Sequence, residues 1–187
     1  MSQHFLILMS FVYAIALTHL FSSAADLIQA RERVHFYGPQ ALWMAVMLVA
    51  LFNNFLGLVH LNEVKAWTLA NEANNFVYGG VQYFTCALVS VRVEPEVPVD
   101  MEIAYLKQRR AFLGAATLMG LIVIANDTVT RFEDPAWQTH VLLNVPFLVF
   151  YAIGAFAKPR WLQWFAAASA LALAVLYMLV FPPMGAG

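Results

Sequence analysis

The chain has 187 residues, of which 62% are hydrophobic and 11% are charged, and its net charge is −1. Soluble domains are about 45–50% apolar and about 25% charged, so a soluble fold of this size lacks the interior to bury the surplus. The absence of a basic run in the sequence argues against nucleic acid as a partner. The composition therefore predicts an integral membrane protein whose main partner is the lipid bilayer.

Six apolar stretches of about 20 residues follow one another along the chain, and each can cross about 30 Å of hydrocarbon as an α-helix. They occupy residues 5–27, 41–61, 68–91, 111–130, 135–157 and 161–181. This pattern predicts an all-α fold, a polytopic transmembrane helical bundle of about six spans in a single domain over residues 1–187.

The residues between the stretches predict where helices begin. Gly38-Pro39 predicts a turn before the second stretch. Asp100 is expected to cap a short surface helix over residues 100–110 that leads into the fourth stretch. Asp134-Pro135 is expected to start the fifth, which should bend at Pro146.

The basic residues predict an orientation. Eight of the ten Lys and Arg residues lie in or beside the first, third and fifth connections: Arg31, Arg33, Arg92, Lys107, Arg109, Arg110, Lys158 and Arg160. Only Lys65 and Arg131 lie in the even connections. By the positive-inside rule, the odd connections are cytoplasmic and both termini lie outside.

The outward ends of spans two to five carry many polar side chains. These spans contribute amides and two acids at similar depth: Asn53, Asn54, Asn71, Glu72, Asn75, Asn126, Asp127 and Asn144. Such groups are costly if they face lipid without a partner, so they are expected to face one another or water. We interpret them as a polar pocket, with interhelical hydrogen bonding as the alternative. Glu72 and Asp127 are expected to attract or coordinate a permeant.

The first span carries a second polar stripe in its inner half. His19, Ser22 and Asp26 recur at helical spacing and therefore share one face. An imidazole and a carboxylate on one face can relay protons, and the stripe could continue a path from the outer pocket. The alternative is an interhelical hydrogen bond from His19, with Asp26 at the interface.

Two histidines on the outer side, His60 and His140, are the candidates for a haem or a divalent metal. No His-x-x-x-His or Glu-x-x-His pair anchors a site on one helix, so no cofactor is predicted. The sequence also has no Gly-x-Ser-x-Gly and no phosphate-binding glycine loop. These features favour a protein that is not an enzyme.

Two segments resemble a known group of proteins. The residues Ala16–Leu20, followed by Arg31–Tyr37, form the first, and Tyr105–Arg110 forms the second. Together they resemble small uncharacterised bacterial multi-pass inner-membrane proteins. The resemblance implies a bacterial inner-membrane location and carries no activity with it.

Three functions follow from these features. The first is a conduit for a small ion or polar solute, which uses the outer pocket and the inner stripe. The second is a non-catalytic accessory or assembly subunit of a larger membrane complex, and the third is a membrane redox or metal protein. The small-residue run Ala166–Ala170 predicts a close helix contact, either within the chain or between copies in a homo-oligomer.

Overall fold

The computed structural model describes residues 3–58, 69–94, 97–130 and 137–180. These residues form six α-helices: α1 (Gln3–Gln29), α2 (Gly38–Gly57), α3 (Leu69–Val89), α4 (Met101–Thr130), α5 (Trp137–Phe156) and α6 (Arg160–Val180). A 3-10 turn, η1 (Arg31–Arg33), and two short strands, β1 (Val34–His35) and β2 (Val99–Asp100), complete the described structure. The prediction of an all-α fold is confirmed.

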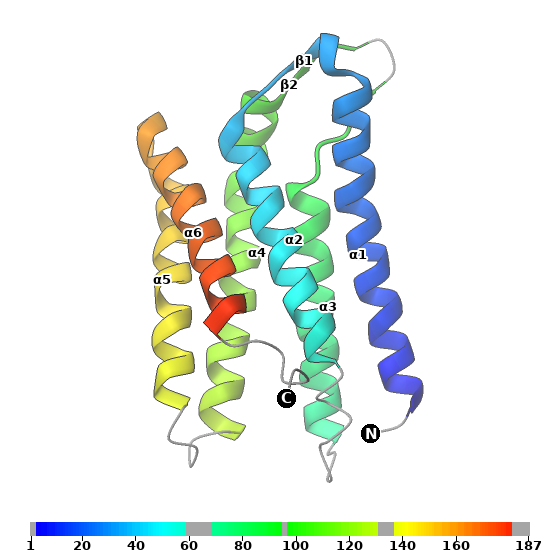
Figure 1. The fold of residues 1–187 in the computed structure, drawn as a ribbon, viewed down its shortest axis with the longest axis vertical. Coiled ribbons are helices and arrows are strands. Elements are labelled where there is room, and N and C mark those ends of the chain that lie inside the picture. The colour runs from blue at the N-terminus through cyan, green and yellow to red at the C-terminus, as the bar shows by residue number, and fades with distance from the viewer. Residues whose placement is uncertain (1–2, 59–68, 95–96, 131–136, 181–187) are drawn as a thin grey trace.

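The six helices run alternately up and down (Figure 1). Helices α1, α3, α4 and α5 pack side by side in that order, and α2 and α6 pack against each other. Helix α2 also contacts α1, α3 and α4, while α6 contacts α5. Helix α2 is therefore the central element of the bundle.

Four of the helices, α1, α2, α4 and α6, are long and apolar enough to cross a membrane. Helix α5 has a shorter apolar part, Val141–Phe156, and it continues as a helix through Pro146. Large hydrophobic side chains lie exposed on the outer surface of the bundle, among them Phe11, Phe84 and Leu179. Lipid is the solvent in which such a surface is stable.

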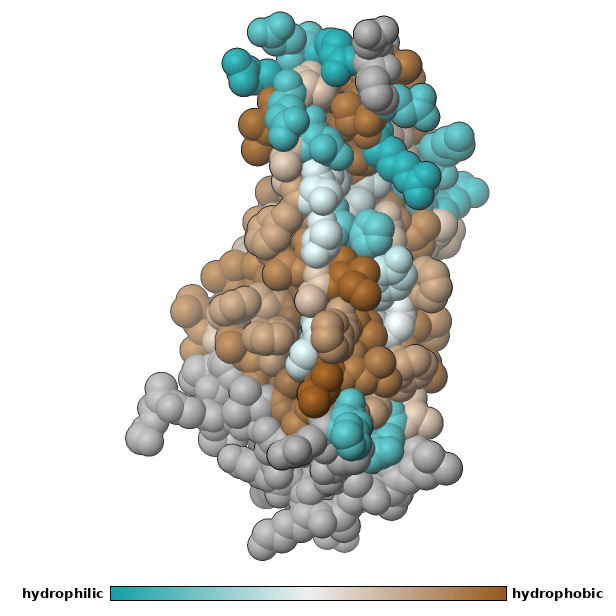
Figure 2. Space-filling view, turned by 90° about the vertical axis from the view of Figure 1, so that its right-hand side faces the viewer, coloured by the Kyte–Doolittle hydropathy of each residue, from teal (hydrophilic) through white to brown (hydrophobic). Residues whose placement is uncertain are grey.

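Strand β1 lies in the connection between α1 and α2, and β2 lies in the connection between α3 and α4. We call the end of the molecule where these two strands pair the strand end. Strand β1 pairs with β2 in parallel, with Val34 opposite Val99 and His35 opposite Asp100. The first, third and fifth connections, in or beside which the eight basic residues lie, are at this end (Figure 1). Figure 2 shows one side of the molecule, where hydrophilic residues gather at the strand end and hydrophobic residues cover most of the coloured surface in the middle.

The helix starts differ in part from those predicted. Asp100 is confirmed as a cap, because its Oδ1 accepts a hydrogen bond from the backbone N–H of Ile103 at 3.0 Å. Helix α4 runs unbroken through Ala111, so residues 101–110 lengthen the fourth helix and do not form a separate one. Gly38-Pro39 is not a turn before the helix but its first turn, a place where proline is favoured. The predicted start at Asp134-Pro135 lies outside the described residues.

The capping carboxylate makes the strand end sensitive to acid. The hydrogen bond from Ile103, together with the nearby His35, lowers the pKa of Asp100 below its ordinary value of 3.8. The stabilisation from this group is therefore complete above pH 3.8 and is lost as the pH falls through the lower, folded pKa. We expect the thermal midpoint of the wild type to fall more steeply between about pH 4 and pH 2 than that of Asp100→Asn. Equal slopes in a pH series of thermal unfolding would contradict this role.

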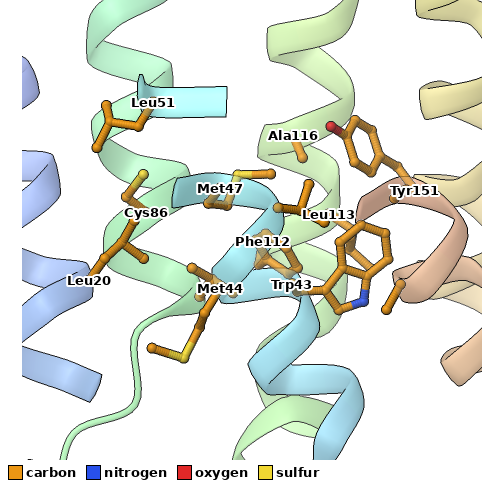
Figure 3. Packing of buried hydrophobic residues seen from close by; sticks show 14 of the residues in the cluster. Leu20, Trp43, Met44, Met47, Leu51, Cys86, Phe112, Leu113, Ala116 and Tyr151 are labelled. Atoms are coloured by element: carbon orange, nitrogen blue, oxygen red, sulfur yellow. The ribbon is translucent and has the colours of Figure 1, made fainter. Parts of the chain in front are cut away.

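The core lies around α2, where buried side chains of α1, α3, α4, α5 and α6 meet it. Trp43 is fully buried, and its ring centroid lies 5.8 Å from those of both Phe112 and Tyr151 (Figure 3). In α6, Ala166, Ala167 and Ala170 are fully buried within the chain. The predicted small-residue contact is therefore made inside the bundle by these three alanines.

Candidate functional site

A cavity of about 110 Å³ lies among α2, α3, α4, α5 and α6. Its polar lining consists of Asn53, Asn54, Tyr78, Asn144, Tyr151 and Tyr177. Its apolar lining consists of Val46, Val49, Ala50, Met119, Gly120, Val123, Phe147 and Ala174. None of these residues is charged, and the cavity is large enough for roughly three or four water molecules of ~30 Å³ each.

Helix positions place the cavity in the half of the bundle away from the strand end. The lining begins at Val46 on α2 and at Met119 on α4. Trp43 on α2 and Phe112 on α4 precede these positions, and both are fully buried. Because each of these two helices begins at the strand end, a packed apolar core separates the cavity from that end.

One amide in the lining connects two helices. The Nδ2 of Asn54 donates one hydrogen bond to Tyr78 Oη at 2.6 Å and another to Gln82 Oε1 at 3.0 Å. Gln82 is fully buried, and its Nε2 has no hydrogen-bond partner among the residues that the structure describes. Such a donor is costly in an apolar bundle.

No family model, curated protein or solved structure matches this chain. A functional assignment therefore depends on the chemistry of the chain's own residues.

The structure brings together part of the predicted outer cluster. Asn53 and Asn54 of α2 line the same cavity as Asn144 of α5. Away from the cavity, the Nδ2 of Asn74 donates to Asn126 Oδ1 at 3.2 Å and connects α3 to α4. The amides thus serve in both predicted ways, as lining and as interhelical hydrogen bonds.

The predicted acids are placed differently. Glu72 is partly buried in the first turn of α3 and lies outside the cavity lining, as does Asn75. The side chains of Asn71 and Asp127 lie outside the described part of the structure. A role for these four residues in permeation stays a prediction.

Three tyrosines of the lining were not among the predicted residues. Tyr78, Tyr151 and Tyr177 come from three different helices, and Tyr151 and Tyr177 lie in otherwise apolar stretches of sequence. A buried tyrosine usually directs its hydroxyl to a polar partner, so its position within a span was a usable signal. Tyr78 also lies four residues before Gln82, on the same face of α3.

The inner stripe forms a separate cleft. His19, Ser22 and Asp26 of α1 line a cleft of about 400 Å³ with Arg92 and Glu94, which follow α3. His19 Nε2 lies 3.3 Å from Tyr83 Oη, which matches the predicted interhelical hydrogen bond. This cleft has no described lining residue in common with the cavity, so the two are separate spaces lined by different residues.

The metal and haem candidates fall outside the described structure. His60 lies in the connection 59–68, and the side chain of His140 is not described. Within the described ranges, no group of three or more His, Cys, Asp or Glu side chains could hold a metal ion.

Proposed function

We propose that the chain is a six-span protein of the bacterial inner membrane that admits a small neutral polar solute to the cavity among α2–α6 and conducts it across the bilayer. The alternating helices and the four long apolar ones support membrane insertion. The eight basic residues at the strand end favour a cytoplasmic location for that end, with both termini outside. The cavity then lies in the outer half of the membrane.

The uncharged polar lining is the observation that carries this proposal. Three amides and three phenols from α2, α3, α5 and α6 line the cavity, and none of the described residues around it is an acid or a base. Amide and hydroxyl groups can replace the water around a neutral solute, whereas an ion would enter without an opposite charge to offset its desolvation. The lining therefore favours a neutral permeant over an ion.

Conduction requires a conformational change. The apolar core around Trp43 and Phe112 lies between the cavity and the strand end and is closely packed. A solute that enters from outside is held there until these helices move apart. We therefore propose a gated conduit, with the core as the inner barrier.

Proteoliposome swelling tests this function. Vesicles that contain the purified chain are placed in isosmotic glycerol or urea, and the swelling rate is followed by light scattering. Ala50→Phe places a ring into the cavity from α2 and is expected to lower the protein-dependent rate at least about ten-fold, because it removes the space for the solute. Ala125→Phe, at an exposed position on α4 outside the lining, is the matched control and should keep the wild-type rate.

The same assay separates the alternatives. Glu72→Gln tests the predicted permeation role of this acid: a fall in glycerol and urea flux would place Glu72 in the path, and unchanged flux would remove it. Wild-type vesicles that swell no faster than empty ones, with the chain folded and inserted, would contradict the conduit. Recovery of a stoichiometric partner in mild detergent together with that result would favour the accessory-subunit function.

A further inference from the structure

A long apolar groove runs between α1 and α2 on the outer surface of the bundle. Its part near the strand end has a volume of about 440 Å³, and the adjoining part has a volume of about 640 Å³. Phe21 of α1 and Leu48 of α2 line both parts, so the two are continuous. The groove exists because α1 packs mainly against α3 and touches α2 less extensively.

The groove has the dimensions of an acyl-chain site. Along α2 it extends from Ala41 to Phe55, which is about 21 Å at 1.5 Å per residue. One leaflet contributes about half of the ~30 Å hydrocarbon core, so the groove can take the full depth of one lipid chain. Apart from the Tyr13 hydroxyl and Arg31, its lining is apolar.

A single charged residue lies at one end of the groove. Arg31, in η1, lines the part near the strand end and is exposed. Among the residues that the structure describes, it is the only charged one in the lining of either part. A guanidinium binds phosphate through a fork of N–H donors, and basic residues at the cytoplasmic ends of helices attract anionic headgroups.

We propose that this groove is a binding site for one anionic phospholipid of the cytoplasmic leaflet. An acyl chain lies between α1 and α2 and contacts Phe21 and Leu48, while the headgroup phosphate lies against Arg31. The apolar lining with one cation at its cytoplasmic end is complementary to a lipid of this charge. This inference uses the proposed membrane orientation and is independent of the solute cavity, which shares only Val49 with the groove.

Lipid binding is tested on the full chain purified in mild detergent. Phosphatidylglycerol or phosphatidylcholine with identical oleoyl chains is added, and bound lipid is counted by native mass spectrometry. One phosphatidylglycerol per chain is expected, bound about five-fold more tightly than phosphatidylcholine, since one basic residue near an anionic headgroup has about this effect. Arg31→Gln should reduce the preference to near equality. Lys158→Gln, an exposed cation at the strand end that lies outside the groove, should preserve it.

A neighbouring pair of alanines tests the acyl-chain part. Ala24 lines the groove, whereas the adjacent Ala25 is exposed on another face of α1. Ala24→Trp should lower the occupancy of both lipids at least about five-fold, and Ala25→Trp should not. If Ala24→Trp fails to fold, as judged by circular dichroism, the exposed Arg31→Gln variant still tests the site.

Several results would overturn the proposal. Equal occupancy by the two lipids in the wild type would show that the bound lipid is a non-specific shell and that the groove does not select an anionic headgroup. If Arg31→Gln and Lys158→Gln lowered the preference for phosphatidylglycerol equally, general surface charge and not this site would explain the preference. A stable homodimer that Ala24→Trp dissociates would assign the groove to a second copy of the chain. Release of the chain from membranes by carbonate would contradict membrane insertion itself. Loss of solute flux with lipid binding intact would contradict the conduit function and leave the lipid site standing.

Discussion

Replacing Trp43 by Ala is expected to lower the free energy of unfolding by about 3 kcal/mol. The indole is fully buried and packs against Phe112 and Tyr151, so its removal leaves a cavity at the centre of the bundle. Burial of large aromatic residues in soluble proteins contributes about 3–5 kcal/mol by the same substitution. We expect the lower end of this range, because lipid tails are as apolar as the core and only packing contacts are lost.

The control for this prediction is the same substitution at an exposed tryptophan. Trp161, at the start of α6, is 68% exposed, and Trp161→Ala should change the free energy of unfolding by less than about 1 kcal/mol. Unfolding by dodecyl sulfate in mixed micelles, followed by far-UV circular dichroism, measures both variants against the wild type. Equal losses would show that Trp43 is not part of a uniquely packed core.

Hydrophobic patterning predicted the helices closely. The sixth stretch was predicted at 161–181, and α6 spans 160–180; the third was predicted at 68–91, and α3 spans 69–89. A run of apolar residues indicates the part of a helix that can lie in lipid. The predicted ends of a helix are therefore right where the apolar run and the helix have the same length. In α4 they do not coincide, since five of its first ten residues are charged or carry an amide and yet belong to the same helix.

Contacts between distant segments could not be predicted from patterning. The pairing of Val34 with Val99 joins two strands of two residues, which are too short to show any periodicity. The contact of α2 with α6 is equally non-local, and helical spacing says nothing about which helices are neighbours. Spacing identifies the face of a helix, and packing decides what that face meets.

For the cavity as well, the sequence predicted which residues need polar neighbours but not which residues those neighbours are. Asn53 and Asn54 were predicted to face polar groups, and depth from the positive-inside rule placed Asn144 at a similar level. The neighbour that Asn54 contacts, Tyr78, could only be known from the packing of α2 against α3. Gly79, one residue later, illustrates how specific that packing is: an added Cβ would lie 2.4 Å from Cε of Met9 on α1.

Replacing Ser23 by Ala is expected to lower the free energy of unfolding by about 2–4 kcal/mol. The Ser23 hydroxyl donates a hydrogen bond to the backbone oxygen of Val91 at 3.0 Å and accepts one from its N–H at 2.8 Å. Both residues are buried, so the substitution leaves a backbone donor and a backbone acceptor without these bonds. Each such group costs about 1–3 kcal/mol when it is left without a hydrogen bond. The loss of one oxygen atom leaves two of them, the N–H and the C=O of Val91, in this state.

Ser22 is the matched control for this substitution, since it is the adjacent residue of α1 and is exposed. Ser22→Ala should change the free energy of unfolding by less than about 0.5 kcal/mol. Hydrogen exchange adds a local measurement, because the amide of Val91 should exchange faster in Ser23→Ala and at the wild-type rate in Ser22→Ala. Unchanged exchange at Val91 in Ser23→Ala would mean that this hydroxyl does not hold the end of α3 against α1, and that the inner cleft beside His19 is supported by other contacts.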